Sequence, residues 1–284
     1  MCGQANGLLV SFGGHSLKVD SDSPQITSAM QAHLRHCHVD EQRGDLITEF
    51  FITGTDKSTF LISENGNVLF PALGMSYDFT LQMLMTELIS RLVAVSNMGM
   101  VLHGAALTWQ ENGLVLCGKS SSGKSSLAAW LIAKGFHYLT DEIIEVPLNG
   151  EHIYGLPRSI FLKSGSAFIW QFHLPDTNVP GFLSFEDGGA WIDPHLFHPG
   201  GVTDKVRPSV LIFPQYRVKA PLQTQKLTTA EALFQLMQTL VNARNLPGHG
   251  MDAATRLVRQ VRAYTLTYSD IEAATNWIKQ TLTI

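Results

Sequence analysis

The sequence predicts an α/β fold, in which a small α+β region precedes a domain built around a nucleotide-phosphate loop. Three observations lead to this prediction. A buried-type strand, a Gly/Ser-rich loop and a helical pattern follow one another over residues 113–135. Short strand-like runs with turn signals dominate residues 1–74, as is typical of antiparallel strands. Apolar residues then recur at helical spacing from Phe79 to Asn97, which predicts one long helix between these two parts.

Turn and cap signals divide the N-terminal region. Gly13-Gly14 and Asn65-Gly66 are two-residue turn signals, the second being a strong hairpin signal. Ser23 is a suitable N-cap for a helix that begins at Pro24 and runs to about His36. The predicted strands of this region cover residues 8–12, 16–19, 45–53, 60–63 and 67–70.

The loop of residues 118–125 matches the phosphate-binding pattern GxxxxGK[ST] at every fixed position. Its glycines let successive backbone N–H groups face one point, and the helix that follows directs its positive dipole end to the same place. Lys124 supplies a cation for the β- and γ-phosphates, and the Ser125 hydroxyl is a Mg²⁺ ligand. The residues expected to bind the nucleotide are Gly118, Lys119, Ser120, Ser121, Ser122, Gly123, Lys124, Ser125 and Ser126.

Asp141 is the second informative position, because we expect a strand over residues 136–141 that ends on this carboxylate. A carboxylate beside a phosphate loop can hold Mg²⁺ or accept the proton of an attacking hydroxyl. It can also cap a helix or lie in a solvated turn, and we favour the functional role. Glu142 is either a second polar ligand or a solvated side chain. His103, on an otherwise apolar strand, is by itself best explained as a hydrogen-bonded core histidine.

The C-terminal half continues with alternating strands and helices. The predicted strands cover residues 101–107, 143–146, 151–154 and 210–213, and the predicted helices cover 229–240, 253–261 and 269–282. Ser269, with Glu272 three residues on, is expected to cap the last helix. Residues 171–208 are dense in Gly, Pro, His and Asp, which indicates irregular structure of the kind found in lids and binding segments.

Potential metal ligands occur outside the phosphate loop. One group lies in a single short segment and consists of His33, His36, Cys37, His38 and Asp40. No second ligand pair follows at zinc-motif spacing, so we expect no metal there. His195 and His198, in the Gly/Pro-rich segment, also lack partners in the sequence.

Composition describes an ordinary globular protein of 284 residues, with 45% hydrophobic and 15% charged residues. The formal charge of −4 argues against a general nucleic-acid or membrane-surface binder. The three cysteines have no pairing-type spacing and are expected to be reduced thiols. We see neither a signal peptide nor an apolar run of transmembrane length, so we expect a cytoplasmic protein.

From His103 onward the pattern resembles the HPr kinase/phosphorylase family, especially its shorter HPr-kinase-like relatives. The early matching elements are His103–Leu107, Gly118–Ser125, Leu131–Phe136 and Tyr138–Glu142. The later ones are Leu156–Ile160 with Lys163, then Val210–Tyr216 and Tyr264–Asp270. The resemblance covers roughly residues 96–284, so we divide the chain into an accessory α+β region (1–95) and a kinase domain (96–284).

The resemblance implies a phosphate-loop kinase of the fold shared with PEP carboxykinase, which uses ATP and Mg²⁺ to phosphorylate a serine-type hydroxyl. By the family pattern, Asp141 is the catalytic base and Lys124 holds the γ-phosphate. Mg²⁺ is bound by Ser125, with Asp141 as a second ligand, and His103 lies beside the site as a catalytic or orienting residue. The expected substrate contacts are Glu142, Arg158 and Lys163.

The chain also differs from the family pattern. The acidic pair is Asp141-Glu142 instead of two aspartates, and residues 152–156 replace the element that supplies a metal-binding glutamate, leaving Glu151 as its nearest substitute. The family's Gly-Arg-Asn loop is absent, and its possible replacements are Arg158, Arg207 and Arg217. We therefore expect the acceptor to be another small protein, a peptide or a hydroxyl metabolite. The first 95 residues would select it or mediate assembly into a homo-oligomer. The alternative hypothesis is a nucleotide-binding regulatory module without phosphoryl transfer.

Overall fold

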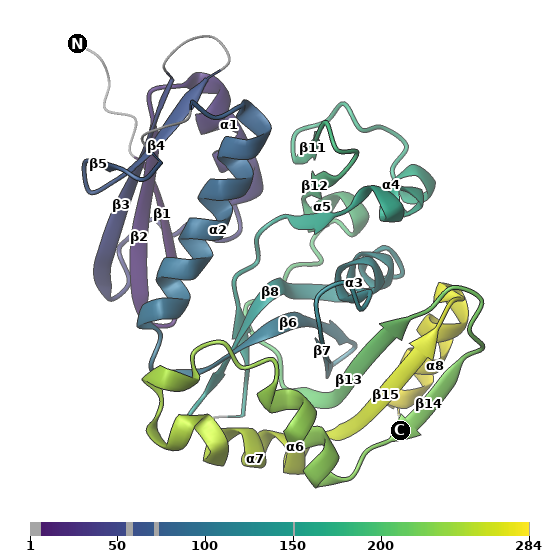
Figure 1. Ribbon diagram of the computed structural model, residues 1–284. Coiled ribbons are helices and arrows are strands. Elements are labelled where there is room, and N and C mark those ends of the chain that lie inside the picture. Colours follow the sequence, from purple (N-terminus) through teal and green to yellow (C-terminus); the bar gives the residue numbers. More distant parts are fainter. Residues whose placement is uncertain (1–6, 55–58, 71–73, 150, 284) are drawn as a thin grey trace.

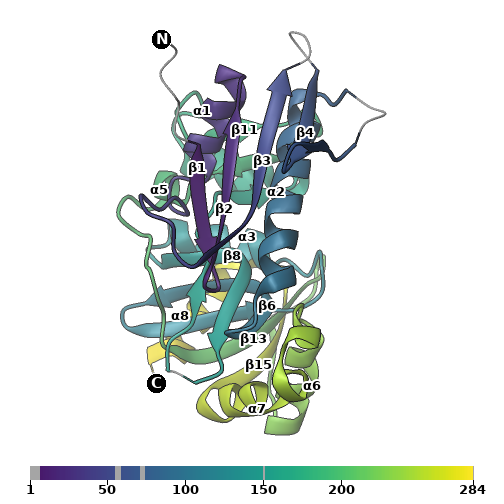
Figure 2. The ribbon, with the colours of Figure 1, turned by 90° about the vertical axis from the view of Figure 1, so that its left-hand side faces the viewer.

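A computed structural model describes residues 7–54, 59–70, 74–149 and 151–283 of the chain. This part has a mixed α/β structure with three β-sheets. The N-terminal sheet stands beside the central sheet, and a small sheet with short helices lies above the central one in the view of Figure 1. Figure 2 shows the N-terminal sheet face-on, with its strands running along its long helix.

The N-terminal sheet has the strand order β1-β2-β3-β4-β5 and is antiparallel except between β2 and β3. Helix α1 connects the two parallel strands, and α1 and α2 pack their apolar residues against the sheet (Figure 2). The bounds are β1 Leu8–Phe12, β2 His15–Ser21, α1 Pro24–His33, β3 Asp45–Gly54, β4 Phe60–Glu64, β5 Asn67–Val68 and α2 Tyr77–Val95.

Local signals in this region act as the sequence predicts. Asn65 and Gly66 both have positive φ (49° and 81°), as a tight hairpin turn requires. Ser23 caps α1, its hydroxyl accepting from the N–H of Ile26. Helix α1 ends at His33, three residues before the expected end, and α2 starts two residues earlier than expected because Ser76 caps it.

The central sheet has the order β14-β15-β13-β7-β6-β8-β9. Strand β13 runs parallel to both β7 and β15, and β6 is antiparallel to its neighbours β7 and β8. The bounds of its strands are β6 Gly99–Trp109, β7 Asn112–Cys117, β8 His137–Pro147, β9 Tyr154–Gly155, β13 Pro208–Tyr216, β14 Gln223–Lys226 and β15 Arg262–Tyr268.

Helices cover both faces of the central sheet, and alternation along β7 shows how. Leu114 and Leu116 belong to the core beneath α3 (Lys124–Ala133) and α8 (Ile271–Thr283). Val115 and Cys117 face the opposite core, which α6 (Thr229–Met237) and α7 (Met251–Gln260) cover (Figure 1). A strand buried on both faces reads as a continuous apolar run, which is the pattern seen here.

Strand β8 does not end at Asp141, as we expected, but continues to Pro147. Its ladder with β6 is long, running from His137 paired with Thr108 to Pro147 paired with Gly99. The predicted short strand and its successor over residues 143–146 are therefore one element. Asp141 lies within the sheet, where its neighbours bury it.

The prediction of irregular structure over residues 171–208 holds for most of the segment, although short helices and strands interrupt it. Its role as a lid or binding segment stays a prediction. The end of helix α4, two strands and helix α5 occupy this segment, and the two strands join β10 in a three-stranded sheet of order β10-β12-β11. The buried residues of this sheet are Ile160 and Leu162 of β10 and Ala190, Trp191 and Ile192 of β12. The bounds are β10 Ile160–Leu162, α4 Ala167–His173, β11 Phe182–Ser184, β12 Ala190–Ile192 and α5 Pro194–Phe197.

One hydrophobic cluster crosses the predicted boundary at residues 95 and 96. It contains the core of the N-terminal sheet and α2 together with Val101, Ile143, Leu156, Phe185 and Trp191. The two parts thus share buried apolar surface, and their division into domains stays a prediction. No described helix is both long and apolar enough to span a lipid bilayer.

Candidate functional site

A cavity of ≈ 720 Å³ opens where β7 gives way to α3. The Gly/Ser loop (residues 118–123) and the start of α3 form one wall, and the middle of β8 forms another. The predicted residues that line the cavity are His103, Ser120, Ser121, Gly123, Lys124, Ser125, Ser126, Asp141, Glu142, Arg158 and Lys163. The structure therefore brings most of the predicted site together. Gly118, Lys119 and Ser122 lie in the loop but do not line the cavity.

Backbone carbonyl groups of the Gly/Ser loop bind the side chain of Lys124. The Lys124 ammonium donates to the carbonyls of Gly118 and Lys119 at 2.8 and 3.0 Å. Gly118 and Gly123 have φ of 150° and 97°, and a Cβ on Gly123 would lie 2.9 Å from the Tyr268 hydroxyl oxygen. Only glycine fits at position 123, because the left-handed conformation and this close approach both exclude a side chain.

Lysine side chains beside the loop suit an anionic ligand. The Lys163 ammonium, from beyond β10, reaches to 3.4 Å from the Ser121 hydroxyl. Cationic groups thus approach the loop from two elements. Lys124 is buried, and burial lowers the pKa of its ammonium group, while the carboxylate of Asp141 opposes that shift.

Asp141 is buried in the cavity wall, with only 6% of its surface exposed. Burial raises its pKa to about 7, and the nearby charge of Glu142 adds to the effect. A hydrogen bond from Ser125 and the positive charges of Arg158 and Lys124 act in the opposite direction. This carboxyl group therefore exchanges its proton near neutral pH, as a general base should.

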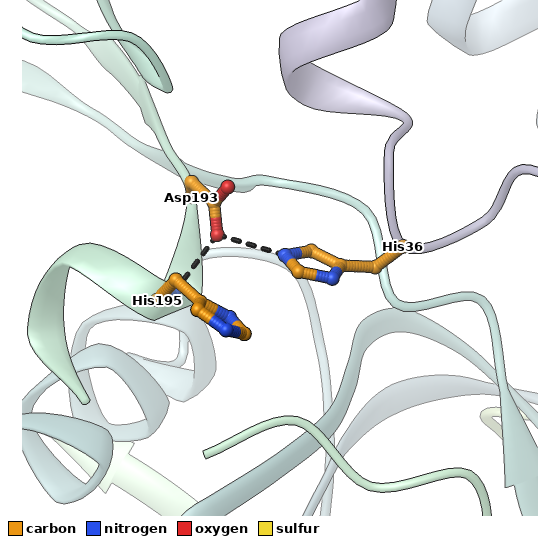
Figure 3. A group of neighbouring side chains, drawn as sticks. All are labelled: His36, Asp193 and His195. Atoms are coloured by element: carbon orange, nitrogen blue, oxygen red, sulfur yellow. Dashed lines mark hydrogen bonds and ion pairs between the residues drawn. The ribbon is translucent and has the colours of Figure 1, made fainter. Parts of the chain in front are cut away.

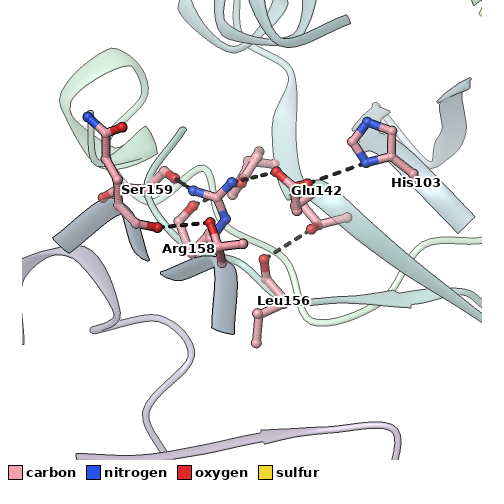
Figure 4. A network of polar contacts seen from close by, with 9 residues as sticks. His103, Glu142, Leu156, Arg158 and Ser159 are labelled. Atoms are coloured by element: carbon pink, nitrogen blue, oxygen red, sulfur yellow. Dashed lines mark hydrogen bonds and ion pairs between the residues drawn. The ribbon is translucent and has the colours of Figure 1, made fainter. Parts of the chain in front are cut away.

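Glu142, the next residue, is held in the ionised state. Its carboxylate accepts from Arg158 Nη2 at 2.6 Å and lies 3.3 Å from Nδ1 of His103 (Figure 4). Burial opposes ionisation, but the hydrogen bonds from His103 and Arg158 outweigh it and lower the pKa of Glu142 to about 2. Two adjacent carboxyl groups thus have widely separated pKa values, an arrangement typical of acid–base sites.

Arg158 is part of this network and also lines the cavity. It is 6% exposed and donates to Glu142 and to the backbone carbonyl of Ser159 (Figure 4). Its own carbonyl accepts from the Tyr138 hydroxyl. Its charge is matched by that of Glu142. Arg158 thus fixes Glu142, while its buried Nε has no hydrogen-bond partner within the described residues. The predicted substrate contact of Arg158 stays a prediction.

The other candidate replacements lie away from the cavity. Arg207 and Glu151 pair with one another at 3.2 Å and are both about two-thirds exposed. Arg217 donates to the side chain of Gln215 at 3.0 Å. None of these three belongs to the cavity lining, so Glu151 does not supply the missing carboxylate there.

Aromatic residues of the cavity were not predicted. Tyr216 and Tyr268 lie at the carboxyl ends of the parallel strands β13 and β15, with their rings edge-to-face at 5.8 Å. Phe161 and Phe168 line the side formed by β10 and α4. The signal for the tyrosines was available, because carboxyl ends of neighbouring parallel strands meet at one edge of a sheet, where ligands commonly bind.

Comparison with known proteins adds little at this point. The chain matches no protein-family model and no curated protein. Among solved structures, the HPr(Ser) kinase/phosphatase from Coxiella burnetii is similar over 64% of this chain and 95% of its own, with 12% identity and a TM-score of 0.33. This likeness is too loose to carry an argument about this chain.

Proposed function

We propose that this chain is an ATP-dependent, Mg²⁺-requiring kinase. It transfers the γ-phosphoryl group to a serine-type hydroxyl of a small protein, a peptide or a metabolite. One observation carries the proposal: a lysine held by the Gly/Ser loop and a buried carboxyl group with a pKa of about 7 line the same cavity. Phosphoryl transfer needs both a cationic cradle and a proton acceptor for the attacking hydroxyl.

The donor and acceptor groups of the cavity fit a nucleotide phosphate and a divalent cation. The loop N–H groups and the hydroxyls of Ser120 and Ser121, which line the cavity, can donate to phosphate oxygens. Ser125 and Asp141, already joined by a hydrogen bond, offer oxygen ligands of the kind that Mg²⁺ prefers. Bound Mg²⁺ would neutralise charge on the phosphates. The exposed rings of Phe168 and Tyr216 provide apolar surface for the rest of the nucleotide.

Each charged residue then has a defined part. Lys124 exchanges its bonds to the loop carbonyls for phosphate oxygens and keeps a positive charge beside them. Asp141 takes the proton of the acceptor hydroxyl. Arg158 and His103 keep Glu142 ionised, and the charge of Glu142 makes Asp141 a stronger proton acceptor. In this scheme His103 and Arg158 are positioning residues.

A second candidate is a nucleotide-binding regulatory module that does not transfer phosphate. The observation in its favour is that Glu151, the nearest substitute for a second metal carboxylate, is paired with Arg207 outside the cavity. The pKa of Asp141 favours the kinase, because a module that only binds has no need of a proton acceptor.

The kinase is tested by offering γ-labelled ATP and Mg²⁺ to a lysate of the source cell, and then to serine and Ser-containing peptides. We expect label on one protein or small molecule, and a fall of about 100-fold or more with Lys124→Ala. Lys134→Ala, at the far end of α3 and paired with Glu272, is the matched control and should transfer normally. Tight ATP binding by the wild type with no labelled product would support the regulatory module.

A further inference from the structure

Three potential metal ligands meet at a place remote in sequence. His36 follows helix α1, whereas Asp193 and His195 lie at the start of α5, and their candidate ligand atoms are all within 4.8 Å of one another (Figure 3). Asp193 is 1% exposed at its side chain, and the His36 side chain is 15% exposed. The group belongs neither to the cavity described above nor to the proposed kinase chemistry.

We propose that His36, Asp193 and His195 form a binding site for a divalent transition-metal ion of the zinc type. Two imidazoles and a carboxylate are a ligand set that zinc commonly takes, with a water in the fourth position. Oxygen-only cations such as Mg²⁺ do not favour imidazole ligands. The site would connect the segment after α1 to α5, joining parts of the chain that lie 157 residues apart.

The contacts of Asp193 leave it suitable as a ligand. Its Oδ1 accepts from His36 Nε2 at 3.0 Å and from the backbone N–H of His195 at 2.9 Å. Its Oδ2 forms an ion pair with Arg35, 3.2 Å from Nε, but has no hydrogen-bond partner among the described residues, so this oxygen can bind a cation. Arg35 also repels a cation, but its side chain is 47% exposed and solvent screens that charge.

His195 has an available nitrogen. Its Nδ1 is buried and makes no hydrogen bond to any described residue, which is costly unless a ligand completes it. Its ring stacks on that of His36 at 4.8 Å between centroids with an interplanar angle of 20°. Because the two rings are nearly parallel, the nitrogen lone pairs of His36 and His195 do not point to one common position. One ring must therefore turn about χ2 when the metal binds, and histidine side chains make this rotation readily. The ion replaces the proton that His36 shares with Asp193.

The test uses the full chain, stripped of metal and without nucleotide, so its result is independent of the proposed kinase. Zn²⁺ is titrated against a chromophoric chelator, and Co²⁺ binding is followed by visible ligand-field absorption. We expect a single Zn²⁺ per chain and an intense Co²⁺ spectrum typical of tetrahedral coordination. His36→Gln and His195→Gln should each weaken Zn²⁺ binding about 10- to 100-fold.

His38→Gln is the matched control, because His38 lies two residues from His36 but contacts the backbone of Leu9 and the fully exposed Asp40, and not the proposed site. It should bind Zn²⁺ as the wild type does. Circular dichroism of the metal-free variants checks that each is folded. Equal Zn²⁺ binding by all four proteins, or a weak octahedral Co²⁺ spectrum in the wild type, would overturn the site and leave a plain His–Asp ion pair.

Discussion

At the scale of single residues, Asp141 and Glu142 show how environment separates two adjacent carboxyl groups. Asp141 is buried with one hydrogen-bonding hydroxyl and its pKa rises, whereas Glu142 is fixed by a guanidinium and an imidazole and its pKa falls. Glu142 is thus ionised and raises the pKa of Asp141, which titrates near neutral pH. Burying Asp141 should cost stability, since the charged form is poorly solvated there.

This cost gives a pH prediction. The pKa of Asp141 is about 7 in the folded chain against 3.8 for the free side chain, so the native state binds the extra proton between those values. Its contribution to stability therefore falls as pH rises from about 4 to 7. Asp141→Asn removes this loss and should raise the free energy of unfolding at pH 8 by roughly 1–3 kcal/mol.

Urea denaturation of the metal-free wild type and Asp141→Asn at pH 5 and pH 8 measures this difference. The stabilisation by the variant should be larger at pH 8, because only there is the wild-type carboxylate charged. The difference would have the same size at both pH values if Asp141 were ionised throughout.

At the scale of elements, caps and turns were predictable where the signal is local. The Gly/Ser loop, the Asn65-Gly66 hairpin and the Ser23 cap each depend on neighbours within a few residues. The cap of α8 was predicted wrongly. Ser269 donates to the carbonyl of Ala220, and Asp270 Oδ1 accepts from the N–H groups of Glu272 and Ala273. Ser269 does not cap the helix because its hydroxyl bonds to a carbonyl 49 residues away in the sequence.

The α8 cap can be tested directly. Asp270→Ala leaves two N–H groups of the first turn without an acceptor and should lower the free energy of unfolding by about 1 kcal/mol. Thermal unfolding compares it with Ser269→Ala, which removes a hydrogen bond to the loop but not the cap. An unchanged free energy of unfolding in Asp270→Ala would contradict the assignment of Asp270 as the cap.

Contacts between elements that are distant in the chain could not be predicted from the sequence. Glu142 and Arg158 form a pair only because β8 and the segment after β9 come together, and His36 meets Asp193 across most of the chain. Motif spacing could not reveal either. The sequence located the cavity residues near the Gly/Ser loop, but it could not show that Arg158 pairs with Glu142, because that contact depends on tertiary packing.

At the scale of the whole molecule, the shared hydrophobic cluster ties the N-terminal sheet to the central sheet. Leu156 and Trp191 are buried against residues of the N-terminal part, whose core they complete. Neither part can therefore unfold without exposing apolar surface of the other. We expect one cooperative unfolding transition for the whole chain.

Equilibrium denaturation tests this cooperativity. The five tryptophans all lie after residue 96, and all except Trp191 belong to or pack on the core beneath α3 and α8. Their fluorescence therefore reports mainly on the C-terminal part, while far-ultraviolet circular dichroism reports on both. The two curves should coincide. Separate transitions would instead show that residues 1–95 fold as an independent unit.

The central claim is that Asp141 is the base of a phosphoryl-transfer site formed by the Gly/Ser loop. The most direct measurement compares wild type and Asp141→Asn for ATP affinity and for turnover on one acceptor. Asn keeps the shape of the side chain but accepts no proton. We predict ATP affinity within a few-fold of wild type and a turnover lower by about 100-fold or more. Near-normal turnover in the variant would contradict the account.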